Sequence, residues 1–138
     1  MERILKIGFV KVGEWKITDE HFSHTIENHL AERKLLYAFV SKNEVLYIGK
    51  TTDSLKSRMN GYKNANSTQK TNVRVKAKIH ELLNLGEEVS VYILIDKTEF
   101  KFGDYKLCLA SGLEDILIAD IKPKWNDRGV IRINHAIR

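Results

Sequence analysis

The chain has 138 residues, 43% of them hydrophobic and 30% charged, and its formal net charge is +5. This composition excludes a disordered or membrane-embedded chain, and the length suits one domain with its own core. The single cysteine, Cys108, excludes an internal disulfide and a zinc site made of cysteines, which favours a reducing, cytoplasmic compartment. Lys6 interrupts any signal-peptide core near the N-terminus. The basic balance favours a polyanionic partner, and no membrane partner is expected.

Residues 1–33 are predicted to form a strand and then a helix. The strand covers Ile4–Val12, and Thr18 or Asp19 is in position to cap a helix that runs to about Arg33. Apolar residues at steps of four predict the helix, and they are Phe22, Ile26 and Leu30. We expect this extension to pack on the rest of the chain.

A β-hairpin is predicted after the extension. Two apolar runs, Leu35–Val40 and Val45–Ile48, flank the polar segment Ser41–Glu44, a pattern typical of two strands joined by a four-residue turn. Asp53 is expected to cap the helix that follows, Ser54–Tyr62.

The later segments complete a mixture of strands and helices. They are a polar loop at Lys63–Asn72, a helix at Val73–Leu85 that ends at Gly86, a strand at Val89–Ile95, an extended segment at Glu99–Tyr105, and a helix from Ser111 to just before Pro123. This order predicts an α+β fold with a small antiparallel sheet, three-stranded at its core and flanked by helices. The main domain would comprise residues 34–138.

Positive charge is concentrated between Asp53 and Glu81, where the sequence has no acidic residue. The candidate nucleic-acid-binding residues in this segment are Lys56, Lys63, Lys70, Arg74, Lys76 and Lys78. They form either a solvated basic face or a surface that neutralises phosphates, which gives affinity without sequence preference. A basic tail follows near the C-terminus, with Arg128, Arg132 and Arg138.

The hairpin and the helix after it carry the most specific pattern. Its residues, continued on the last helix and beyond Pro123, are Tyr37, Tyr47, Gly49, Lys50, Arg58, Tyr62, Glu114 and Asn126. From about Lys34 to Asn126 this order resembles the GIY-YIG nuclease family, which is named for two short strand motifs. Leu35 stands where the family has its first glycine.

These residue types suit phosphodiester hydrolysis. Arg58 supplies a permanent positive charge with a fork of donors that matches a phosphate, and Tyr62, four residues later, lies on the same helix face. Glu114 is a hard oxygen ligand of the kind that Mg²⁺ prefers. The pKa of a phenol is near 10, so neither Tyr37 nor Tyr47 is a good base unless a nearby positive charge lowers it.

The family resemblance implies a role for each residue of the pattern. Tyr37 would be the base for an attacking water, with Tyr47 and Lys50 in support, although which tyrosine takes the proton stays open. Glu114 would hold one Mg²⁺ or Mn²⁺ ion. Asn126 is carried over as a further catalytic residue. Gly49 is expected to allow a backbone or phosphate to approach closely.

Each residue also has a structural interpretation. The tyrosines could be ordinary strand aromatics, and Ser111 with Glu114 matches a capping box that would occupy the carboxylate at its own helix start. Two functions are therefore weighed. The first is a metal-dependent endonuclease acting on double-stranded or branched DNA, with RNA left open and a homodimer plausible for two-strand cleavage. The second is a nucleic-acid-binding module of the same fold that no longer cuts.

Overall fold

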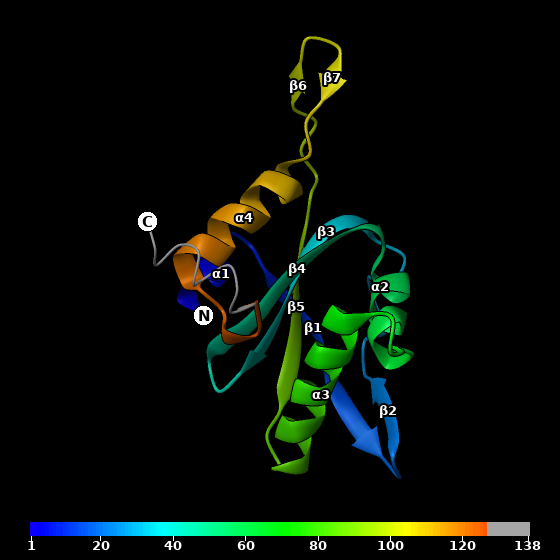
Figure 1. Cartoon of the computed structure of the whole chain (residues 1–138). Helices are drawn as coiled ribbons and strands as arrows, with labels where there is room; N and C mark the ends of the chain where they lie inside the picture. Colours follow the sequence, from blue (N-terminus) through cyan, green and yellow to red (C-terminus); the bar gives the residue numbers. More distant parts are fainter. Residues whose placement is uncertain (127–138) are drawn as a thin grey trace, which may run out of the picture.

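The computed structural model describes residues 1–126, and at its centre is a five-stranded antiparallel sheet (Figure 1). In spatial order the strands are β2 (His21–His24), β1 (Val10–Thr18), β5 (Val89–Ile95), β3 (Arg33–Ser41) and β4 (Glu44–Ser54). The helices are α1 (Glu2–Lys6), α2 (Leu55–Lys63), α3 (Lys70–Asn84), α4 (Leu109–Ile121) and the 3₁₀ turn η1 (Lys124–Asn126). The α+β class is confirmed, but the sheet has five strands where the sequence predicted a core of three. The predicted basic tail lies outside the described residues.

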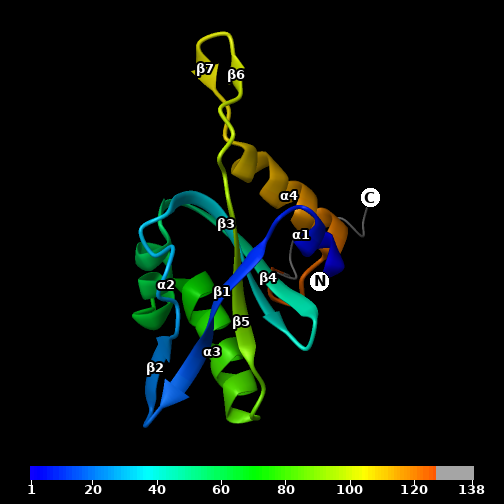
Figure 2. The same cartoon turned by 180° about the vertical axis from the view of Figure 1, so that it is seen from behind.

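Helices cover both faces of the sheet. α2 and α3 lie on one side, and α1 and α4 lie on the other (Figures 1 and 2). The inner strand β3 is buried on both faces, because Leu35, Tyr37 and Phe39 pack with α2 and α3 whereas Leu36 and Ala38 pack with α4. A strand buried on both faces has a continuous apolar sequence, which explains why this segment lacks the alternation of a surface strand. Within residues 1–126, no helix is long and apolar enough to cross a membrane.

The helix predicted in residues 1–33 is wrong. The chain turns at Asp19 and Glu20, both at positive φ, and returns as the strand β2, which pairs with β1. Phe22 stacks on Trp15 with 4.7 Å between the ring centroids. Cross-strand pairing and this aromatic contact outweigh the four-residue spacing that suggested a helix.

The predicted strand Ile4–Val12 is also misplaced. Ile4 belongs to the short helix α1, and the strand begins at Val10, opposite Ile93 of β5. Residues 1–33 therefore extend the sheet by two strands and contribute to its core. The fit is close, because a Cβ atom at Gly13 would lie 2.7 Å from the Cγ1 atom of Ile26.

The central hairpin is confirmed, with a tighter turn than predicted. Lys42 and Asn43 have φ angles of 51° and 61°, the left-handed conformation of a two-residue type I′ turn. The next helix is capped by Ser54 and not by Asp53, since the Ser54 hydroxyl accepts a hydrogen bond from the backbone N–H of Ser57 at 3.1 Å. Strand β5 has the predicted bounds.

The two later helices begin earlier than predicted. α3 begins at Lys70, inside the predicted polar loop, and Gly86 at φ 81° follows its end as expected. α4 begins at Leu109, which puts Ser111 inside the first turn. The alternative of a capping box between Ser111 and Glu114 is therefore wrong, because Ser111 is not the residue before the helix.

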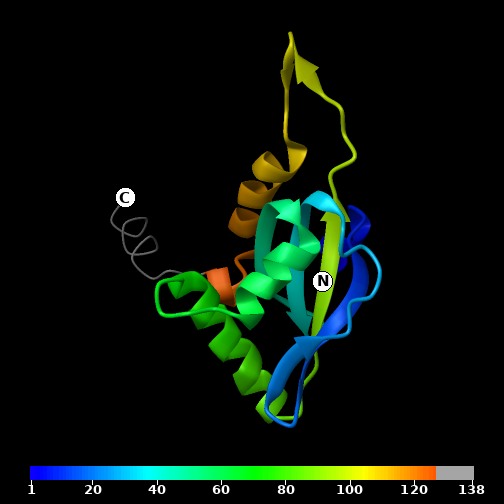
Figure 3. The same cartoon turned by 90° about the vertical axis from the view of Figure 1, so that its right-hand side faces the viewer.

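A two-stranded ribbon precedes α4, where the sequence predicted only an extended segment. It consists of β6 (Lys101–Phe102) and β7 (Tyr105–Lys106), joined by a turn with Gly103 at φ 65°. The ribbon projects well beyond the body of the protein, past the N-terminal end of α4 (Figures 1 and 3).

Candidate active site

Tyr37, Arg58 and Tyr62 form one hydrogen-bonded cluster between β3 and α2. Arg58 and Tyr62 lie on the same face of α2, and Tyr37 packs against them from β3. The two phenol oxygens are 2.6 Å apart. Arg58 donates from Nε to the Tyr37 oxygen at 2.8 Å and from Nη2 to the Tyr62 oxygen at 3.1 Å. Three residues of the predicted pattern are thus in direct contact.

Asn72 belongs to the same cluster, although it was predicted to lie in a surface loop. Its Oδ1 atom accepts a hydrogen bond from Arg58 Nη2 at 3.2 Å, and its Nδ2 atom donates to the carbonyl of Gly61 at 3.4 Å. The signal that could have revealed it is spacing, because Asn72, Val75 and Ile79 share the buried face of α3. A polar residue on that face requires a partner, and Arg58 is the partner.

Gly49 makes room for the phenol of Tyr37. The two residues are opposite each other in the β3–β4 ladder, and a Cβ atom at Gly49 would lie 2.4 Å from both Cζ and Oη of Tyr37. The sequence predicted close approach at this glycine. The group that approaches is an aromatic ring of the protein itself, so Gly49 is needed to place the Tyr37 oxygen within reach of Arg58.

Burial controls the ionisation of the two phenols. Removal from water raises the pKa of Tyr37 far above its usual value near 10, although the Arg58 guanidinium acts in the opposite direction. Burial also raises the pKa of Tyr62, and the neighbouring phenols add to that increase. Both phenols are therefore protonated at neutral pH in this arrangement, and one donates a hydrogen bond to the other.

Tyr47 lies beside the cluster as the third phenol of this core. Its ring centroid is 6.3 Å from that of Tyr37 and 6.5 Å from that of Tyr62. It stacks on Phe39 at 5.8 Å. Tyr47 is 7% exposed whereas Tyr37 and Tyr62 are fully buried, so of the three it is the one that reaches the surface.

Lys50 and Glu114 form an ion pair on the other side of β4. The Lys50 ammonium is 3.8 Å from a carboxylate oxygen of Glu114, whose side chain is 15% exposed. Lys50 is opposite Leu36 in the β3–β4 ladder, and Leu36 faces α4. The Lys50 side chain is therefore on the α4 face of the sheet, whereas the ring of Tyr37 lies over Gly49 on the other face. The Tyr37–Arg58 cluster and the Glu114 carboxylate therefore lie on opposite faces of the edge strand β4, the first at Gly49 and the second at Lys50. That they act on one phosphate stays a prediction.

Asn126 pairs with the backbone of the edge strand. Its Oδ1 atom accepts a hydrogen bond from the N–H of Ile48 at 2.9 Å, and its Nδ2 atom donates to the carbonyl of the same residue at 2.8 Å. Arg74 donates to the carbonyl of Trp125 at 2.6 Å, which ties η1 to α3. Both side chains, predicted to act on the substrate, hold the chain in place around β4 in this structure.

The other predicted nucleic-acid-binding residues lie on α2 and α3, and they differ in solvent exposure and in their contacts with the protein. Lys56 and Lys70 are exposed. Lys63, Lys76 and Lys78 are half-buried, and the ammonium of Lys76 donates to the carbonyl of Lys63 at 2.8 Å. Lys70 is therefore the better residue for testing a phosphate contact, because Lys76 also has a structural role in joining the two helices.

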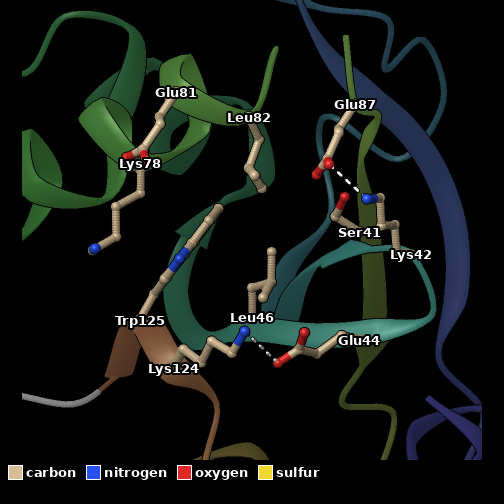
Figure 4. Close-up of a pocket in the computed structure, with 10 residues that line it drawn as sticks. All are labelled: Ser41, Lys42, Glu44, Leu46, Lys78, Glu81, Leu82, Glu87, Lys124 and Trp125. Atoms are coloured by element: carbon tan, nitrogen blue, oxygen red, sulfur yellow. Dashed lines mark ion pairs between the residues drawn. The ribbon is translucent and has the colours of Figure 1, made fainter. Parts of the chain in front are cut away.

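A pocket of about 340 Å³ opens between α3, η1 and the β3–β4 turn (Figure 4). Lys42 pairs with Glu87 at 2.7 Å and Lys124 pairs with Glu44 at 3.3 Å on its rim. These four charges are thus neutralised in pairs, and the pocket lies at the turn of the hairpin, away from Gly49. It is separate from the Tyr37–Arg58 cluster.

Comparison with solved structures identifies two similar folds. One is the structure of a mutant of bacteriophage T4 EndoII, which is 25% identical with a TM-score of 0.70, over 91% of this chain and 96% of that one. The other is the restriction endonuclease HPY188I in complex with product DNA, which is 18% identical with a TM-score of 0.55, over 91% of this chain and 80% of that one. No protein-family model and no curated protein matches the chain. The order of its motif residues and the similarity of its fold support the resemblance of this chain to the GIY-YIG nuclease family.

Proposed function

We propose that the protein is a divalent-metal-dependent endonuclease that hydrolyses phosphodiester bonds in DNA. The observation that carries this proposal is the fixed guanidinium of Arg58, which is held by Tyr37, Tyr62 and Asn72. An arginine on an exposed helix face needs no such support. A fixed guanidinium suits a phosphate because its donors are already oriented before the substrate arrives. The resemblance in fold to two endonucleases, one of them with product DNA, supports the same function.

The scissile phosphate would lie across the edge of β4. Among the described residues, the hydrogen bonds of Arg58 involve Nε and Nη2, so Nη1 is the nitrogen assigned to a phosphate oxygen. Lys50, whose side chain is 44% exposed, would approach the same phosphate from the other side of the strand. The exposed lysines of α2 and α3 would bind neighbouring phosphates of the same DNA.

Tyr37 is our candidate for the group that takes the proton of the attacking water. Its oxygen accepts the Nε–H of Arg58 at 2.8 Å, and a hydrogen bond from Tyr62 would come from an oxygen 2.6 Å away. Both hydrogen bonds favour the ionised phenol, whereas burial opposes it more strongly. Tyr47, the least buried of the three phenols, is the alternative base.

Glu114 is the residue that would hold the divalent metal ion. Residues 1–126 contain no group of three or more His, Cys, Asp or Glu side chains arranged to hold an ion, so a cage built of described side chains does not fit. One carboxylate does fit Mg²⁺ or Mn²⁺, since Mg²⁺ keeps several of its waters and takes few protein ligands. When bound, the ion would neutralise the charge that develops on the phosphoryl and leaving oxygens.

Cleavage of supercoiled plasmid tests the proposal against the alternative of an inactive binding module. Wild-type protein should nick the plasmid with Mg²⁺ and not with EDTA. Glu114→Gln should lower the rate at least a hundredfold, whereas Asp115→Asn, a change at the exposed neighbour on α4, should leave it unchanged. DNA binding without cleavage by the wild type would favour the binding module. An equal loss of cleavage activity in both variants would show that Glu114 has no specific role in the active site.

A further inference from the structure

The projecting ribbon has one face made of large aromatic and aliphatic side chains. Lys101 pairs with Lys106 and Phe102 with Tyr105, and the N–H of Leu107 donates to the carbonyl of Phe100 at 2.9 Å. Alternation along the two strands puts the lysines on one face. The other face carries Phe100, Phe102, Tyr105 and Leu107, which are 60%, 78%, 78% and 51% exposed.

The ribbon is held at its base by the carboxylate of Asp96. One carboxylate oxygen accepts from the backbone N–H of Thr98 at 3.0 Å, where the chain leaves the sheet. The other accepts from the N–H of Ala110 at 3.2 Å, in the first turn of α4. α4 has no capping side chain of its own, so Asp96 satisfies one of its free donors and fixes both ends of the ribbon. The apolar face is thus presented on an anchored arm.

The exposed apolar area is large enough for a specific interface. Aromatic side chains carry about 150–250 Å² each, so the four ribbon residues expose about 500 Å² together. Leu109 and Ile116 of the following helix α4 are also 42% and 64% exposed. A standard interface buries about 800 Å² per partner, whereas the largest apolar patch of a monomer is about 300–600 Å². A ribbon of two short strands is also marginally stable by itself in water.

We propose that the ribbon is a dimerisation arm that packs against the same ribbon of a second copy of this chain. Contact between two apolar faces about a two-fold axis is self-complementary and leaves Lys101 and Lys106 pointing to solvent. DNA is a less suitable partner for this face. Residues 97–107 contain three lysines and two acidic residues, which gives a net charge of only +1, and the acidic Asp104 lies at the tip of the ribbon. The dimer does not depend on nuclease activity, although it would supply the second active site that a two-strand cut requires.

Sedimentation equilibrium of the full chain without DNA, from about 1 to 100 μM, tests the arm. The wild type should be a dimer. Phe102→Asp should raise the dimer dissociation constant at least a hundredfold, because the charge would be buried against the partner. The matched control, Lys101→Ser on the opposite face, should change it less than threefold. Circular dichroism checks that both variants keep the fold, which is expected because the ribbon lies outside both cores.

A second measurement places the two ribbons together directly. In a Cys108→Ser background, Phe102→Cys should form an intermolecular disulfide under mild oxidation and Lys101→Cys should not. A monomeric wild type at about 100 μM would overturn the proposal. So would equal effects of the Phe102 and Lys101 substitutions on assembly. If the wild type is monomeric and Phe102→Asp instead weakens DNA binding, the ribbon is a DNA contact and the dimer arm is refuted.

Discussion

Replacing Gly49 with alanine should displace Tyr37 and disrupt the active-site cluster. The new methyl group would lie 2.4 Å from Cζ and Oη of a ring that is fully buried. Gly49 does not have a positive φ, so alanine can adopt its backbone conformation. The cost of the substitution therefore comes from the contact between the new methyl group and the Tyr37 ring. An extra methyl in a closed core costs about 1–3 kcal/mol. Loss of the hydrogen bonds to Arg58 and Tyr62 adds about 1–3 kcal/mol, for a total near 4 kcal/mol.

Urea unfolding followed by tryptophan fluorescence measures this cost. The matched control is Gly112→Ala in α4, where the new Cβ would meet no atom within 4 Å beyond its chain neighbours and the backbone of its own helix. This change should stabilise the helix by about 0.5–1 kcal/mol. Combination with Tyr37→Leu removes the ring, and Gly49→Ala should then cost less than about 1 kcal/mol. A Gly49→Ala protein within about 0.5 kcal/mol of the wild type would refute the steric reasoning. An equal cost in both backgrounds would refute it too.

Three further predictions follow from the charged and titrating groups. If Tyr37 takes the proton, its raised pKa means that the ionised fraction grows tenfold per pH unit, so the logarithm of the cleavage rate should rise with a slope of about one between pH 6 and 9; a flat profile would exclude this base. Lys70→Ala should weaken DNA binding equally on all sequences and reduce its salt dependence by about one ion. Fluorescence anisotropy at several salt concentrations measures both effects. Lys76→Ala should also lower the free energy of unfolding, because the Lys76 ammonium donates a hydrogen bond to the carbonyl of Lys63. Partial burial raises the pKa of Asp96, but its hydrogen bonds lower it more, so its stabilising contribution should be present above about pH 4 and lost as the pH falls further. Urea unfolding of wild type and Asp96→Ala should therefore differ by about 1–2 kcal/mol at pH 7 and converge near pH 2, and a constant difference would contradict the assignment.

Local patterns predicted the part of the site that lies within one stretch of chain. Tyr37, Arg58 and Tyr62 are on a hairpin and the helix that follows it, and their strand register and helical spacing fix which faces meet. Asn72 was missed because it falls in a polar segment whose helical start has no capping side chain to mark it. A residue that acts by satisfying a buried donor is recognised from burial, which composition alone does not show.

The N-terminal part of the fold was not predictable from spacing. Phe22 and Ile26 are four residues apart, which fits a helix, yet one is in β2 and the other fills the space over Gly13. Short apolar segments fit either structure, and the deciding contact, Trp15 on Phe22, comes from pairing between strands. The predicted strand at Val89–Ile95 was right because every second residue in it is β-branched, from Val89 to Ile95.

The amide of Asn126 on Ile48 bears on solubility as well as on shape. β4 is the outermost strand on its side, and a bare outermost strand offers free N–H and C=O groups to other chains. Asn126 occupies one such pair and imitates a residue of an additional strand. Without this amide, the N–H and C=O of Ile48 would be open to pairing with another chain, which is the hazard that unpaired edge strands carry.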